Sequence, residues 1–200
     1  MADYKRTTEP TSNPIDLAYV KRHARIETTD EDDDIQSKIN AAVRFVERQY
    51  SLAAITQTWT MTLDRFPADG RIYLPVRPVQ SITSLKYTDT DGDQQTWSGA
   101  NYRLLDADGL RPYITYIYNG AWPSSVRTDL DSIEVVWSAG YGDSAADVPA
   151  DFRQALAVLV ATYFGNREIL DGYVSTGADY QLRDSLRGLG IVPEVDGVEC

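Results

Sequence analysis

Four short stretches carry residues whose types could do chemistry, and the first looks like the start of a calcium-binding loop. Asp89-Thr90-Asp91-Gly92-Asp93 places carboxylates at alternate positions. A helix–loop–helix calcium site also needs Gly at its sixth position and Glu at its twelfth. Those positions hold Gln94 and Ala100, and the flanking residues indicate strands. The stretch therefore predicts a hairpin turn, not a calcium site.

A second stretch, Gly140-Tyr141-Gly142-Asp143-Ser144-Ala145, lies between an expected strand and an expected helix, as a dinucleotide-binding loop would. The preceding strand, however, belongs to an antiparallel block and not to a βαβ unit. Asp143 and Asp147 would also stand where a pyrophosphate has to bind, and like charges repel. The stretch is better interpreted as a flexible exit from a sheet into helices.

The other two candidates are the acidic run Asp30–Asp34 and His23, the only histidine. Neighbouring helical residues point in different directions, so the run cannot converge on one ion and instead complements the helix dipole. His23 has no Cys partner, no nucleophilic Ser context and no second His at helical spacing. A hydrolase that uses two of the thirty acidic residues is the weakest hypothesis, because no pair of carboxylates stands out in the sequence. We predict no catalytic residue, no metal site and no cofactor.

Helical periodicity marks both ends of the chain. A short helix is expected from Asn13 or Asp16, and a long one after a cap at Thr29 or Asp30. The long helix carries one apolar stripe: Ile35, Ile39, Ala42, Val43, Val46 and Tyr50. A third helix follows Asp147, and its broad apolar face comprises Phe152, Ala155, Leu156, Leu159, Val160, Tyr163 and Phe164. A last short helix is expected at about 179–187.

Between the helical ends the apolar period changes to two, which indicates strands. Seven are expected: Ile55–Leu63, Arg71–Leu74, Ile82–Thr88, Gln94–Trp97, Tyr102–Leu105, Ile114–Tyr118 and Ile133–Trp137. The fold class is α+β. A helical bundle core of two N-terminal and two C-terminal helices (13–53 plus 142–188) carries an inserted antiparallel β sandwich or barrel (54–141). A flexible N-terminal arm (1–12) and a flexible C-terminal tail (189–200) complete the expected organisation.

The composition narrows the function classes. The 200 residues carry a formal net charge of −11. This charge disfavours a surface that binds nucleic-acid phosphates tightly, but it allows a surface past which DNA slides without being bound. The only cysteine is Cys200, so no disulfide framework is expected. The polar N-terminus and the lack of a long apolar run predict a soluble protein without a signal peptide or a membrane partner.

Several segments, taken in order, resemble the head–tail connector (adaptor) proteins of tailed phages, in the longer form with an inserted β domain. Ile15–Ile26 is similar to the opening helix and its basic turn, and Thr28–Asp34 to the acidic stretch before the long helix. Further along the chain, the segments that resemble the family are Ile55–Trp59, Leu74–Ile82, Ala139–Asp143, Val148–Ala155 and Asn166–Glu168. Ala24 stands where the family usually has Leu, and nothing after Gly188 matches.

The resemblance implies a structural virion protein that is made in the host cytoplasm and located in the neck. It implies a ring, typically of twelve subunits, between the portal protein and a stopper or tail-completion protein. DNA would pass through the lumen during packaging and ejection without specific binding.

Two sets of contact residues are expected. Phe152, Leu156 and Tyr163 are predicted at the subunit interface, because the broad apolar face suits burial between neighbours. The predicted portal contact is Leu186, Leu189, Ile191, Val192 and Pro193. The alternative function is a monomeric ligand- or carbohydrate-binding β module whose aromatic platform is Trp59, Trp97, Trp122 and Trp137.

Overall fold

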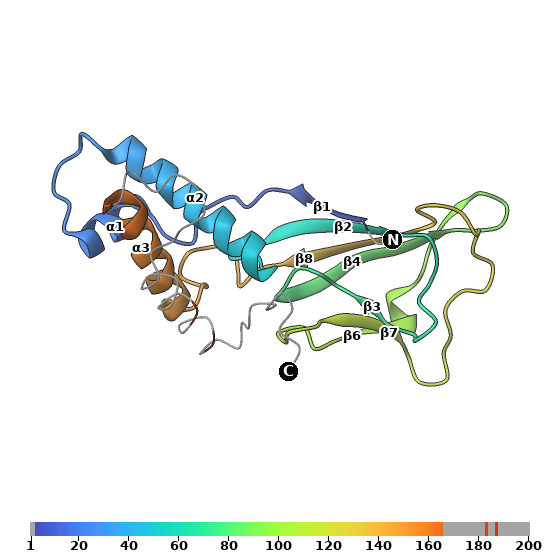
Figure 1. The fold of residues 1–200 in the computed structure, drawn as a ribbon. Coiled ribbons are helices and arrows are strands. Elements are labelled where there is room, and N and C mark those ends of the chain that lie inside the picture. The colour runs from blue at the N-terminus through green and yellow to red at the C-terminus, as the bar shows by residue number, and fades with distance from the viewer. Residues whose placement is uncertain (1–2, 166–182, 184–186, 188–200) are drawn as a thin grey trace, which may run out of the picture. The chain divides into compact units, whose positions relative to one another are not determined.

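The computed structural model describes residues 3–165 together with Arg183 and Arg187 (Figure 1). The chain divides into two compact units. A β unit comprises residues up to Pro10 and Thr56–Tyr141, and a helical unit comprises Thr11–Ile55 and the chain from Gly142 onward. The architecture is thus α+β, as the sequence predicts. Apart from one strand near the N-terminus, the strands occupy the middle of the chain; two of the described helices precede them in sequence and the third follows.

The β unit consists of two antiparallel sheets. Five strands form the larger sheet in the order β1-β2-β8-β4-β5, and three form the smaller in the order β3-β7-β6. Their bounds are β1 Asp3–Thr8, β2 Gln57–Leu63, β3 Ile72–Tyr73, β4 Val79–Thr88, β5 Gln94–Thr96, β6 Tyr102–Leu105, β7 Tyr113–Tyr116 and β8 Ile133–Ala139. A short 3₁₀ helix, Gly99–Asn101, precedes β6.

Strand β8 is the centre of the larger sheet. Its residues alternate strictly between buried and half-buried, and Trp137 is completely buried. The indole Nε1 of Trp137 donates to the Val76 carbonyl at 3.2 Å, so the large ring has no unsatisfied donor. Met61 on β2 and Leu85 on β4 are buried on the strands beside it. The core of this unit therefore lies on one face of the larger sheet.

Strand β1 corrects one expectation, because Asp3–Thr8 belongs to the segment predicted to be a flexible arm. The strand pairs antiparallel with β2, and Asp3 stands opposite Thr62. Tyr4 contacts the ring of Trp59 at a centroid distance of 6.0 Å, and the Arg6 guanidinium lies 6.0 Å from the same ring. These polar residues carry no apolar alternation, so their order comes from the partner strand and not from their own pattern.

Strand β4 is longer than expected at its N-terminal end, where it starts at Val79. Its pairing with β8 shifts register between Val79 and Ser81 and again between Ile82 and Ser84. Each irregularity interrupts the two-residue alternation that marks a strand in sequence. The first residues of β4 therefore give no clear strand signal.

In the helical unit, α1 spans Leu17–Ala24 and α2 spans Asp32–Tyr50. Asp16 caps α1, since its Oδ1 accepts the Tyr19 amide at 2.6 Å. The apolar stripe predicted for the long helix is confirmed, because all six of its residues are buried. Arg25 and Ser51 end the two helices with left-handed backbones at φ 54° and 52°.

The third helix, α3, spans Ala150–Gly165 and packs against both α1 and α2. The last helix expected, at 179–187, lies outside the described residues except for Arg183 and Arg187. Among the described helices, none combines the length and the apolar character needed to cross a bilayer.

Candidate partner-binding site

The residues predicted at a subunit interface lie mainly in the chain's own core. Phe152 and Leu156 on α3 are 1% and 0% exposed. A side chain that its own chain covers completely cannot contact a neighbour unless the fold opens, so these two are core residues in this structure. Tyr163, near the end of α3, stays half-buried, and burial raises the pKa of its hydroxyl. The predicted portal contacts, Leu186, Leu189, Ile191, Val192 and Pro193, lie outside the described residues.

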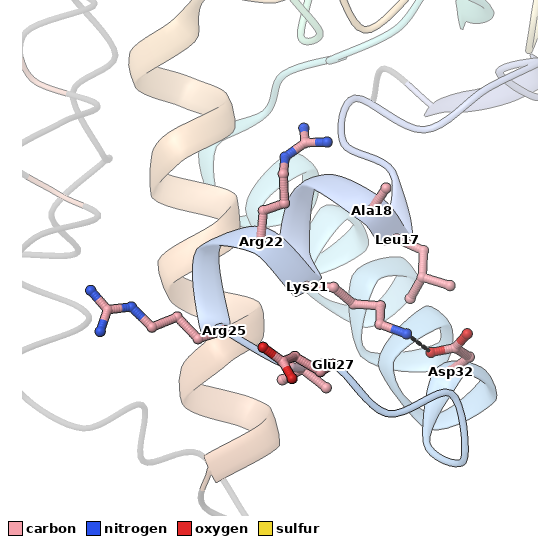
Figure 2. A pocket seen from close by; sticks show the side chains of 8 residues that line it. Leu17, Ala18, Lys21, Arg22, Arg25, Glu27 and Asp32 are labelled. Carbon is pink, nitrogen blue, oxygen red and sulfur yellow. Dashed lines mark hydrogen bonds and ion pairs between the residues drawn. The ribbon is translucent and has the colours of Figure 1, made fainter.

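The described surface of the helical unit contains a pocket beside α1, lined by residues from the start of this helix to the turn that follows it (Figure 2). Its volume is about 660 Å³. The apolar part of its wall is formed by Leu17 and Ala18 from α1 and by Ile26 from the turn that follows. The rest of the lining is charged: Lys21, Arg22, Arg25, Glu27 and Asp32. The pocket thus combines an apolar wall with a charged rim.

The charges on this rim differ in how far they are neutralised. Lys21 donates to Asp32 at 2.6 Å and to the Thr28 carbonyl at 2.8 Å, which ties α1 to the start of α2. Arg22 and Arg25 are exposed, and Figure 2 shows both side chains pointing away from the Lys21–Asp32 pair. Arg25 ends α1 with a left-handed backbone, and its amide donates to the Lys21 carbonyl. This conformation fixes the direction in which the Arg25 side chain projects. Two cations therefore remain available to a partner.

An apolar wall beside two arginines suits one class of ligand, an acidic peptide segment that carries an aliphatic side chain. Burying that side chain supplies affinity, and the guanidiniums pair with carboxylates at the rim, where they also set orientation. Lys21, Arg22 and Arg25 could have been noticed in the sequence as a basic cluster in an acidic chain. The apolar wall could not, because Leu17 and Ile26 are nine positions apart.

The calcium-like stretch forms the predicted turn, between β4 and β5. One carboxylate oxygen of Asp89 accepts the amides of Asp91 and Asp93 at 3.1 and 3.0 Å, and the other accepts Gln95 Nε2 at 2.8 Å. The bond from Gln95 is the largest cause that lowers the pKa of Asp89, and the amides add to it. This carboxylate organises the hairpin with donors of its own segment.

The glycine-rich stretch is also organised from within. Asp147 Oδ2 accepts the amide and the hydroxyl of Ser144 at 2.9 and 2.8 Å, and these bonds lower the pKa of Asp147. A Cβ at Gly142 would collide with the Asp147 side chain, so the loop folds tightly on itself. His23 is exposed at the end of α1. Within the part of the chain that the structure describes, no three His, Cys, Asp or Glu residues form a group that could hold a metal ion.

The four tryptophans do not form an exposed platform. Trp137 is buried, and Trp59 stacks on it at a centroid distance of 6.5 Å. Trp97 and Trp122 lie 5.0 Å apart in a half-buried aromatic cluster, where Trp122 stacks on Phe66 at 4.7 Å. Rings that contact one another in this way serve the packing of the β unit. Their placement does not favour a carbohydrate-binding module.

Comparison with known proteins bears on the whole chain. Residues 14–185 match the sequence model of the head completion protein family. A chain from a structure described as the neck of an empty gene transfer agent (GTA) particle computed with C6 symmetry has the same fold. Its TM-score is 0.76 at 23% identity over 98% of each chain.

Two further structures show the same likeness. In the virion of a native gene transfer agent particle, a chain matches with a TM-score of 0.74 at 24% identity, over 97% of this chain and 98% of that one. In the neck of a native particle computed with C12 symmetry, the TM-score is 0.71 at 23% identity, over 98% of each chain. No curated protein matches the sequence significantly. At these identities the structures establish the fold, and since the family match spans most of the sequence, the chain belongs to the head completion protein family.

Proposed function

We propose that the chain is a head–tail connector (adaptor) subunit in the neck of a phage or phage-like particle. It forms a ring between the portal protein and the stopper or tail-completion protein, and DNA passes through the lumen. One observation carries the proposal. The chain belongs to the head completion protein family, and nearly its whole length shares a fold with chains solved in particle necks.

The symmetry of those necks supports a ring, because C6 and C12 are cyclic groups and each implies repeated head-to-tail contacts. A formal net charge of −11 supports a lumen that does not hold DNA tightly, since tight binding requires cations that neutralise phosphates. The role is structural, and no catalytic step is proposed.

The experiment is cryo-electron microscopy of the full chain mixed with the portal protein of its own particle. We expect a ring stacked coaxially on the portal, which would also give the number of subunits. A folded, monomeric chain that forms no complex with the portal at micromolar concentration would contradict the proposal.

We further propose that the segment containing Leu186, Leu189, Ile191, Val192 and Pro193 contacts the portal. Truncation after Arg187 is then expected to abolish portal binding and to leave the circular dichroism spectrum and the thermal unfolding of the chain unchanged. Full binding by the truncated chain would place the contact elsewhere. Tyr163 remains our proposal for a subunit contact, because its side chain is half-buried and not part of the closed core.

A further inference from the structure

The turn between β7 and β8 presents an unusual side chain. Leu130 is 80% exposed, and Asp129 and Asp131 flank it. Exposing an aliphatic side chain in water is unfavourable, and a single exposed Leu on its own means little. Here, however, the side chain lies in a hydrogen-bonded turn between two carboxylates. An aliphatic side chain with acidic neighbours is the kind of ligand that suits the pocket beside α1.

Hydrogen bonds from both sides fix the turn. Ser132 Oγ donates to the Asp129 carbonyl at 2.8 Å, and the Leu130 amide donates to the Asp129 carboxylate at 2.9 Å. The Asp131 amide donates to Asp64 at 3.1 Å, from a left-handed backbone at φ 55°. The Ser132 carbonyl accepts the Thr88 amide at 2.8 Å, which anchors the turn to β4. Leu130 therefore needs little further ordering to bind, and that favours association.

Resting on the ring proposed above, we propose that the Asp129–Asp131 turn of one copy inserts Leu130 into the pocket lined by Leu17, Ala18 and Ile26 of the next copy. The two half-sites are different surfaces of the same chain, so the contact is head-to-tail. Such a contact repeats from copy to copy and closes into a ring when the rotation between copies allows it. A contact that paired two identical patches would stop at a dimer.

The charges of the two half-sites are complementary. The pocket lining has three cations and two anions, Lys21, Arg22 and Arg25 against Glu27 and Asp32, which leaves +1. The turn has Asp129 and Asp131 against Arg127, which pairs with Asp129 at 3.0 Å, and this leaves −1. Complementary charge at the rim orients two partners and disfavours wrong ones.

Other exposed apolar residues fit the pocket less well. Tyr118 is 89% exposed on the same long β7–β8 connection, but its neighbours Ile117 and Asn119 carry no charge. Leu110 is 51% exposed and is followed by Arg111, which Arg22 and Arg25 would repel. Leu130 alone among these three is flanked by acidic residues on both sides. Tyr118 therefore provides a matched control, since it is at least as exposed and lies on the same connection.

The test is disulfide cross-linking between two different variants in a Cys200→Ser background, where the introduced thiol is the only one in each chain. One variant carries Ala18→Cys at the pocket wall and the other carries Leu130→Cys. Because each chain has one thiol, a cross-link between them must join two copies. The variants are mixed in equal amounts with the portal protein, oxidised briefly and resolved by non-reducing electrophoresis and mass spectrometry.

We expect the Ala18–Leu130 link to form at least about tenfold faster than the link from Ala18→Cys to a Tyr118→Cys control. Adding Arg25→Glu to the Ala18→Cys chain is expected to slow it several-fold, because like charges then meet at the rim. Equal rates for the Leu130 and Tyr118 variants would overturn the inference. Circular dichroism of each variant shows that the chain remains folded.

Failure of this inference can be told from failure of the proposed function. Wild-type rings on the portal in electron micrographs, without a preferred Ala18–Leu130 link, would overturn the turn-in-pocket contact and leave the connector role standing. Absence of any ring on the portal, with the chain folded, would overturn the connector role and this contact with it.

Discussion

Replacing Leu156 by alanine separates a core role from an interface role for α3. Leu156 is completely buried among residues of its own chain. Removing three buried carbons loses roughly 2 kcal/mol of transfer free energy. A term for the cavity left behind adds to this, and leucine-to-alanine changes in cores cost about 2–5 kcal/mol in total. Because α3 packs against two other helices, the site can collapse only partly, and we expect about 3 kcal/mol.

The distribution of tryptophans makes the assay specific to one unit. All four, at positions 59, 97, 122 and 137, lie in the β unit, so their fluorescence follows that unit alone. Circular dichroism at 222 nm follows the helices. For Leu156→Ala the urea midpoint of the dichroism transition should fall by about 1–2 M. The fluorescence midpoint should fall with it only if the two units unfold together.

Gln154→Ala is the matched control, because Gln154 is exposed on the same helix and its hydrogen bond to Tyr19 is long, at 3.5 Å. It should change stability by no more than about 0.5 kcal/mol. If Leu156→Ala instead unfolds like the wild type but fails to assemble on the portal, Leu156 is an interface residue. The assignment to the core would then be refuted.

Three further outcomes are expected. Trp137→Phe should lower the free energy of unfolding by about 1–3 kcal/mol, since the Val76 carbonyl loses its donor in the core. A urea titration in which the variant and the wild type have the same midpoint would contradict this. Gln95→Ala should raise the pKa of Asp89 toward its usual value in a carboxyl NMR titration. Because the folded pKa of Asp89 is lowered, its contribution to stability is present above the unfolded pKa and is lost as pH falls through the folded one, so the variant should lose it at a higher pH than the wild type. Ser51→Gly should stabilise α2 by about 0.5–1 kcal/mol, because glycine adopts the left-handed conformation at its end without strain, whereas Ser51→Ala should not.

The sequence predicts most elements because their patterns are local. The six-residue stripe of α2 and the alternation of β8 each specify one buried face, and the structure has both. Strand β1 could not be found in this way. Its residues are polar and largely exposed, and they are ordered by pairing with a strand about 50 residues away in sequence.

The contact residues show a different limit. An apolar face on α3 predicts burial, but periodicity does not say whether the covering surface belongs to the same chain or to a neighbour. Phe152 and Leu156 are covered by their own chain. The pocket beside α1 needs a helix end and the following turn to be placed in space, and a lone Leu between two aspartates has no periodicity at all.

The proposed turn-in-pocket contact is small, and its size has a consequence for assembly. Burying one leucine supplies roughly 1.5–3 kcal/mol. Stable association at micromolar concentration requires about 8 kcal/mol. Copies with a net charge of −11 also repel one another in solution. On this proposal isolated chains stay apart. Since even a millimolar effective concentration requires about 4 kcal/mol, the contact forms only where the portal itself binds neighbouring copies side by side. A weak head-to-tail contact therefore suits a ring that has to form on the portal and nowhere else.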